Sequence, residues 1–195
     1  MRVKDLILYQ VATDKNYKVG DKLSFGKEKN GQYHKCESLS FNQNGKPLHE
    51  LGFKHYKKGI LKNKDLILNM SRALSDYDFI LREFALEEVR KESFPTLPSR
   101  FTCMYLSENE TTCLNNFTER TITSPNLHHQ AIKVKVSGEA HFVRDFGISR
   151  LGLSYSEYKK LANQYWSQNQ ESTTEAKEIL FIGDVEVLEI LQETK

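Results

Sequence analysis

Seven polar residues that could carry chemistry lie beside apolar runs of the chain. They are Tyr9, Gln10, Ser99, Arg100, Tyr105, Ser107 and Glu178. A glutamate can stabilise positive charge in a transition state, an arginine can bind a diphosphate, and a tyrosine ring can stack on another ring. Each of these residues taken alone is more often a solvated residue at the end of a strand. Their chemistry therefore depends on whether the fold brings them together.

The familiar catalytic and metal-binding patterns are missing from the sequence. There is no glycine-rich phosphate loop, no nucleophile elbow and no HExxH motif. Cys36, Cys103 and Cys113 form no CxxC pair, which predicts reduced thiols in a cytoplasmic protein, without a metal site. Cys103 lies in an apolar run, which favours an inert buried thiol over a nucleophile. The pair His128 and His129 has no further ligand at metal spacing and favours a surface loop.

Charge and hydropathy limit the partners of the chain. The 28 basic and 26 acidic side chains give a net charge of +2, so no strong overall field points to nucleic acid. The apolar run near the N-terminus is too short for a signal peptide. No run approaches the roughly 20 apolar residues of a membrane helix, so we expect no membrane partner. The oligomeric state is left open.

Residues 26–64 are expected to form an irregular basic insertion. The residues of interest there are Lys54, Tyr56, Lys57 and Lys58. A run of lysines is usually a solvated face. The alternative is a weak contact with a nucleic acid or another partner, in which lysines meet phosphates and the tyrosine stacks on a base. A protein that works only through this basic loop is a further possibility.

A long helix followed by a strand is expected to position the central polar residues. Apolar residues recur at helical spacing at Met70, Leu74, Tyr77, Leu81, Phe84, Ala85 and Val89. This spacing predicts a helix over about 66–92 with these residues in the core. Pro95 and Pro98 end the helix. Residues 101–107 alternate and predict a central strand that is covered on both faces.

The remaining pattern predicts an α+β domain over residues 1–195. Strands are expected at 4–12 and 23–25, and a short helix at 107–117 with Ser107 as its cap. A second helix is expected over about 155–167, capped by Ser154 with Glu157. Two hairpins are expected, one turning at residues 137–139 and one at Gly183-Asp184. Because the strands cluster late in the chain without regular alternation with helices, the sheet is expected to be mixed and mainly antiparallel.

The stretch from Arg82 to Ser107 resembles a family of uncharacterised bacterial and phage proteins with the ADP-ribosyltransferase-like fold. The resemblance centres on Leu-Pro-Ser-Arg-Phe-Thr-Cys-Met-Tyr-Leu-Ser, which ends at Ser107. The tail from Ala176 to Val187 is similar to the end of that superfamily, where a glutamate opens a strand. The resemblance implies a split sheet of ADP-ribosyltransferase type. It also implies that NAD is the substrate and that ADP-ribose is transferred to a macromolecular acceptor, either nucleic acid or protein. A toxin, defence or phage effector would act in this way.

The resemblance also implies a role for each polar residue. Glu178 matches the catalytic glutamate, and Tyr105 suits the residue that stacks on nicotinamide. The residues implied to bind NAD are Tyr9, Gln10, Ser99, Arg100 and Ser107, with Arg100 on the diphosphate. Gln10 or Tyr9 stands where the superfamily has an arginine or histidine. Ala176 stands where arginine-modifying members have Glu or Gln, so arginine is not the expected acceptor. The alternative is a non-catalytic module that kept the fold and binds a nucleotide, nucleic acid or protein.

Overall fold

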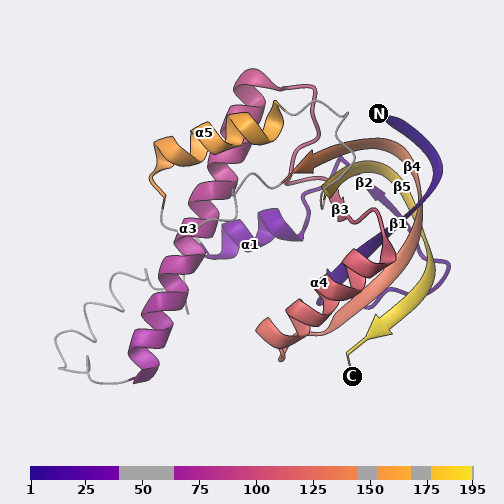
Figure 1. Ribbon diagram of the computed structural model, residues 1–195, viewed down its shortest axis with the longest axis horizontal. Coiled ribbons are helices and arrows are strands. Elements are labelled where there is room, and N and C mark those ends of the chain that lie inside the picture. The colour runs from indigo at the N-terminus through magenta and orange to yellow at the C-terminus, as the bar shows by residue number, and fades with distance from the viewer. Residues whose placement is uncertain (40–63, 145–152, 168–176, 195) are drawn as a thin grey trace.

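The computed structural model describes residues 1–39, 64–144, 153–167 and 177–194 (Figure 1). The predicted basic contact at Lys54, Tyr56, Lys57 and Lys58 lies outside the described residues. The strands are β1 (Arg2–Thr13), β2 (Lys22–Phe25), β3 (Met104–Leu106), β4 (His129–Arg144) and β5 (Lys177–Glu193). The helices are α1 (Gly31–Leu39), α3 (Lys64–Ser93), α4 (Glu110–Thr123) and α5 (Tyr155–Trp166). None of the described helices is long and apolar enough to span a membrane.

The strands form one antiparallel sheet in the order β1-β4-β5-β2, and β3 also pairs with β5. The α+β class and the mainly antiparallel sheet are therefore confirmed. The two main helices are confirmed as well, since α3 covers the range predicted at 66–92 and α5 the range predicted at 155–167. Ser154 caps α5 as predicted, because its side chain accepts from the backbone of Glu157 and the Glu157 carboxylate accepts from Ser154.

The sheet curls until its two ends meet. Ser107, directly after β3, exchanges backbone hydrogen bonds of 2.7 and 3.0 Å with Tyr9 of β1. Figure 1 shows the strong curvature of the long strands β4 and β5. The inner face of the curl holds one apolar cluster: Leu8, Met104, Leu106, Ile132, Val134, Val136, Ala140, Ile179, Phe181, Val185 and Val187. Because side chains alternate along a strand, the residues between these face outward.

The helices cover the outer face in two groups. Helices α3 and α5 pack on each other and on β5 through a second apolar cluster that includes Leu86, Tyr158, Trp166 and Leu180. Helix α4 packs on β1 and β4, where Cys113 and Phe117 meet Ala131. In Figure 1, α1, α3 and α5 lie together on one side of the sheet and α4 lies nearer its other end. The polar residues predicted on outward-facing positions therefore lie beneath or between these helices.

Both predicted hairpins are wrong, because β4 and β5 each run on as a single strand. The two expected turns lie opposite each other, with Gly138 paired to Gly183. The backbones approach so closely there that a Cβ on Gly138 would lie 2.2 Å from the Ile182 carbonyl oxygen. A Cβ on Gly183 would lie 2.6 Å from the Ser137 carbonyl oxygen, and Gly183 also has φ of +137°. These glycines therefore allow a tight bend between paired strands rather than a reversal of the chain.

The buried face of α3 also differs from the prediction. Ala85 and Val89 are buried as expected, but Leu74, Tyr77, Leu81 and Phe84 are 38–69% exposed. The helix instead buries the stripe that contains Ile80, Glu83, Leu86 and Glu87. The prediction from apolar spacing alone was therefore wrong about which stripe is buried. The buried stripe contains the carboxylates of Glu83 and Glu87, and carboxylates can be buried only when ion pairs compensate their charge.

Two local boundaries differ as well. Strand β3 begins at Met104 rather than Phe101, because the backbone N–H groups of Thr102 and Cys103 donate to the Ser99 carbonyl oxygen and form a turn. Helix α4 is capped by Asn109 rather than Ser107, since the Asn109 side chain accepts from the backbone of Thr112 at 2.8 Å. The helix then continues to Thr123, six residues beyond the predicted end at residue 117.

Candidate functional site

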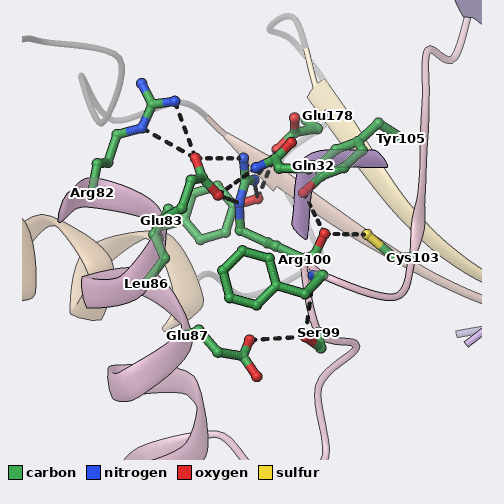
Figure 2. A network of polar contacts seen from close by, with 12 residues as sticks. Gln32, Arg82, Glu83, Leu86, Glu87, Ser99, Arg100, Cys103, Tyr105 and Glu178 are labelled. Atoms are coloured by element: carbon green, nitrogen blue, oxygen red, sulfur yellow. Dashed lines mark hydrogen bonds and ion pairs between the residues drawn. The ribbon is translucent and has the colours of Figure 1, made fainter. Parts of the chain in front are cut away.

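The guanidinium of Arg100 is the centre of a buried polar network between α3, α5 and β5. Figure 2 shows it lying between Glu83 of α3 and Glu178 of β5. Its Nε donates to Glu83 Oε2 at 2.9 Å, and its Nη1 donates to Glu178 Oε2 at 2.6 Å. Arg100 is buried, and its cation faces the fully buried Glu83 on one side and the partly exposed Glu178 on the other. Charge-assisted hydrogen bonds of this kind are short and hold their partners in a defined orientation.

Glu83 is the inner anchor of the network, with no exposed surface. Besides Arg100 it binds Arg82, whose Nη2 lies 3.0 Å from Glu83 Oε1, and it accepts from the side-chain amide of Gln32 on α1. Burial alone would raise the pKa of Glu83, but the charges and hydrogen bonds of Arg100 and Arg82 hold this pKa below its ordinary value. Glu83 is therefore a buried carboxylate that keeps its charge because it is paired.

Tyr165 of α5 joins Arg100 to Glu178. Its hydroxyl accepts from Arg100 Nη1 and donates to Glu178 Oε2 at 2.7 Å. Burial, partly offset by Arg100 and reinforced by Glu178, raises the pKa of Tyr165 well above its ordinary value, so the hydroxyl keeps the proton that it donates. Oxygen Oε2 of Glu178 is thus fixed by two donors on two different elements.

Tyr105 and Cys103 enclose the backbone side of Arg100. The Tyr105 hydroxyl donates to the Arg100 carbonyl oxygen at 2.7 Å, and the Tyr105 ring centroid lies 5.0 Å from the guanidinium carbon. The guanidinium therefore covers one face of the ring predicted to stack on nicotinamide. Cys103 is fully buried, and burial raises the pKa of its thiol, as expected for an inert cysteine.

Ser99 lies in the turn after α3 and belongs to a separate network with Glu87 and Arg90 of that helix. Its hydroxyl donates to Glu87 Oε2 at 2.9 Å, and Glu87 also pairs with Arg90 at 2.9 Å. Arg90 in turn donates to the carbonyl oxygen of Leu97 at 3.0 Å. These contacts fix the turn that follows α3. The structure therefore places Ser99 in a structural role, apart from Glu178.

Ser107 lies next to Glu178 and Tyr9 lies one strand further away, whereas Gln10 faces the other side of the sheet. Strands β3 and β5 pair up to Leu106 and Ile179, so Ser107 and Glu178 are the next residues of the two strands, and Ser107 pairs with Tyr9. Alternation places Gln10 on the opposite, inner face. Its Oε1 is buried and accepts no hydrogen bond from the described part of the chain.

The structure thus brings together Glu178, Arg100 and Tyr105, with Ser107 beside Glu178 and Tyr9 one strand further away. The Arg100 guanidinium is occupied by Glu83, Glu178 and Tyr165, so it holds protein groups and does not present itself to a diphosphate. Glu178 differs from the other network members because its side chain is 35% exposed. An oriented carboxylate that reaches solvent can act on a ligand, whereas the buried groups behind it can only position it.

Glu83 and Tyr165 were not identified from the sequence as site residues. Sequence patterns favour a solvated position for Glu83 on its helix and an apolar position for Tyr165 on α5. The one available signal was the spacing of Glu83, Glu87 and Arg90, which lie three or four residues apart on one helical face. Within the described residues, no group of three or more His, Cys, Asp or Glu side chains is placed to hold a metal ion.

Comparison with known proteins places the chain in a family without assigning it a reaction. No curated protein sequence matches it. The model of the family described as "Protein of unknown function (DUF2441)" matches residues 8–193, so the chain belongs to the DUF2441 family.

Proposed function

We propose that the chain is an ADP-ribosyltransferase-like enzyme that cleaves NAD at Glu178 and transfers ADP-ribose to a macromolecular acceptor. The observation that carries the proposal is the state of Glu178. One carboxylate oxygen is fixed by Arg100 and Tyr165, and the side chain remains 35% exposed. This carboxylate opens the last strand, as the catalytic glutamate does in the superfamily that the sequence resembles.

The chemistry requires a carboxylate of this kind. When the bond between C1′ of the ribose and the nicotinamide nitrogen breaks, its electron pair leaves with nicotinamide, and positive charge develops on the ribose. A carboxylate held in place stabilises that charge without having to reorganise. The acceptor then forms a bond to C1′ and loses a proton. If water takes the place of the acceptor, the same site is an NAD glycohydrolase.

In this proposal the neighbours of Glu178 have different roles, in positioning the carboxylate or in binding NAD. Arg100 and Tyr165 are positioning residues, since they contact Glu178 and lie behind it. Of the other predicted NAD-binding residues, Ser107 lies beside Glu178 in the strand register and Tyr9 pairs with Ser107, and both lie on the outer face of the sheet. Tyr105 supports Arg100 through its hydroxyl and ring.

Release of nicotinamide from NAD tests the proposal. Purified protein is assayed alone and with cell lysate, beside Glu178→Gln and the control Glu189→Gln. Glu189 lies on the same strand but is 56% exposed and pairs only with Lys133 at the surface among the described residues. We expect Glu178→Gln to lose on the order of 10²-fold in rate and Glu189→Gln to retain it. Full activity of Glu178→Gln at unchanged melting temperature would contradict the proposal.

The pairing of Glu178 with Arg100 favours a second candidate, a binding module without catalysis. An arginine at 2.6 Å cancels much of the negative charge that an oxocarbenium-like centre needs. In this case the protein releases no nicotinamide, with or without lysate. A shift of its melting temperature by NAD would then indicate a nucleotide-binding module. Without such a shift, NAD is not the ligand, and the module binds its ligand through a surface other than the Glu178 site.

A further inference from the structure

A basic hollow lies on the sheet at the bend between β4 and β5. Its volume is about 720 Å³. It is lined by Arg2, Val3, Lys4, Phe25, Gly26, Lys27, Gly138, Glu139, Ile182 and Gly183. Hollows of this size hold small ligands or segments of larger ones. Ile182 follows Glu178 by four residues on the same strand, roughly 13 Å at the rise of a strand, so the hollow is distinct from the Glu178 site.

Three glycines line this hollow where the strands approach each other closely. Gly138 and Gly183 pair so closely that a side chain on either would collide with a backbone carbonyl oxygen. Gly26, with φ of +114°, faces Ile182 so closely that an added Cβ would lie 3.0 Å from the Ile182 Cβ. Three lining positions therefore cannot carry larger side chains without strain.

The charged side chains around the hollow are not needed to form the bend, so they point to a ligand. Arg2, Lys4 and Lys27 face a single carboxylate, Glu139. Within the described ranges none of the three cations forms an ion pair. Arg2 lies opposite Glu139 in the β1–β4 register, so these two can balance each other and leave the two lysines uncompensated. A surface with this imbalance attracts anions.

The cations come from opposite sides of the hollow. Arg2 and Lys4 belong to β1, and Lys27 follows β2, which is at the other end of the row Val3–Gly138–Gly183–Phe25. Three spacings between neighbouring strands amount to about 14 Å along the sheet. One phosphate is too small to satisfy both rims, whereas a chain of linked phosphates can contact them in turn. We propose that the hollow binds the sugar-phosphate backbone of a single-stranded nucleic acid.

This site is independent of the proposed catalysis at Glu178, and its test is designed to remain so. Binding of a fluorescent oligothymidylate of about 15 nucleotides is measured by anisotropy for the wild-type chain. The same measurement is made for Glu178→Gln and for Lys4→Glu/Lys27→Glu. The control is Lys15→Glu/Lys133→Glu, which changes the net charge by the same amount outside the hollow lining. Thermal melting shows that each variant is folded.

We expect log K to fall with log salt with a slope of about −1.4 between about 50 and 200 mM, since each of the two phosphates neutralised by Lys4 and Lys27 contributes about −0.7. Lys4→Glu/Lys27→Glu is expected to weaken binding at least about tenfold and to flatten the slope. Glu178→Gln and the control pair are expected to bind within about twofold of wild type. Equal losses in both charge-reversed pairs would overturn the site, because they would indicate a general charge effect.

Further measurements distinguish a single-stranded nucleic acid from other ligands that carry phosphates. Tripolyphosphate and ATP are added as competitors, and a matched duplex is tested for direct binding. The proposal expects single strands to bind more tightly than ATP and than the duplex. Displacement of the oligonucleotide by ATP at equal concentration would indicate a nucleotide site instead, and tighter binding of the duplex would exclude the single-strand assignment.

Discussion

The inner face of the curled sheet and the contact between α3 and its outer face are both buried, but they are stabilised in different ways. The inner face is an apolar cluster in which Leu8 and Ile132 are nearly or fully inaccessible. The outer contact places Glu83 and Arg100 in an equally dry position, where each charge depends on its partner. Apolar groups gain stability by leaving water, whereas buried charges only offset the cost of leaving it.

The two regions differ in whether they can present a functional group at the surface. An apolar cluster has many members that share the same task and tolerate conservative exchange. A paired network has few members, and each one fixes the orientation of the next. Here the chain of contacts runs from Arg82 through Glu83 and Arg100 to Glu178, whose side chain is partly exposed. The network therefore ends in an oriented group at the surface, which the inner face does not.

Removal of Arg100 should produce the largest loss of stability. Arg100→Met leaves Glu83 with only Arg82 as a cationic partner and frees Glu178, so we expect a loss of about 3–5 kcal/mol in the free energy of unfolding. Denaturant unfolding at neutral pH measures this loss. Leu8→Ala is the matched change on the inner face, with an expected loss of about 2–5 kcal/mol from the cavity. A loss below about 1 kcal/mol for Arg100→Met would show that the network adds no more than surface pairs.

The pH dependence of stability should distinguish the two regions more clearly than the size of the stability loss does. The pKa of Glu83 is lowered in the folded chain, so the unfolded chain binds more protons as the pH falls. The contribution of Glu83 is therefore present above its ordinary pKa of 4.5 and is lost as the pH falls below that value. Melting temperatures between pH 7 and pH 3 should fall less steeply for Glu83→Gln than for wild type. Leu8→Ala should keep the wild-type slope, and a shared slope for all three would contradict the role of Glu83.

A surface ion pair should give the smallest effect. Lys133 and Glu189 lie 3.7 Å apart with 33% and 56% of their side chains exposed. Lys133→Ala should change the free energy of unfolding by less than about 1 kcal/mol, with a further decrease of the effect at high salt. The same denaturant measurement serves here. A loss as large as that of Arg100→Met would remove the distinction between buried and exposed pairs.

Local patterns explain which parts of the fold could be predicted from the sequence. The bounds of α3 and α5 follow from helical spacing, from Pro95 and from the cap at Ser154. The stripe of α3 that would be buried could not be predicted, because the answer depends on ion pairs. Arg100 meets Glu83 across 17 residues and Glu178 across 78. No spacing rule connects positions so far apart.

The glycines show the same limit in the sheet. The sequence around Gly138 and Gly183 predicts hairpin turns, since glycine after an alternating run is typical of a turn. Their mutual pairing turns both into positions of close approach within continuous strands. The candidate site was predicted only in part for a related reason. Resemblance pointed to Glu178, Arg100 and Tyr105, whereas Tyr165 and Glu83 appeared only once α5 and α3 were packed on the sheet.

The rate at which Glu178→Gln releases nicotinamide from NAD tests most directly whether the buried network holds Glu178 for catalysis. We expect the wild-type chain to release nicotinamide. We expect the variant, shown to be folded by thermal melting, to lose on the order of 10²-fold in rate. Equal release by the two proteins would make Glu178 a structural partner of Arg100 and nothing more, which would overturn the proposed catalytic role.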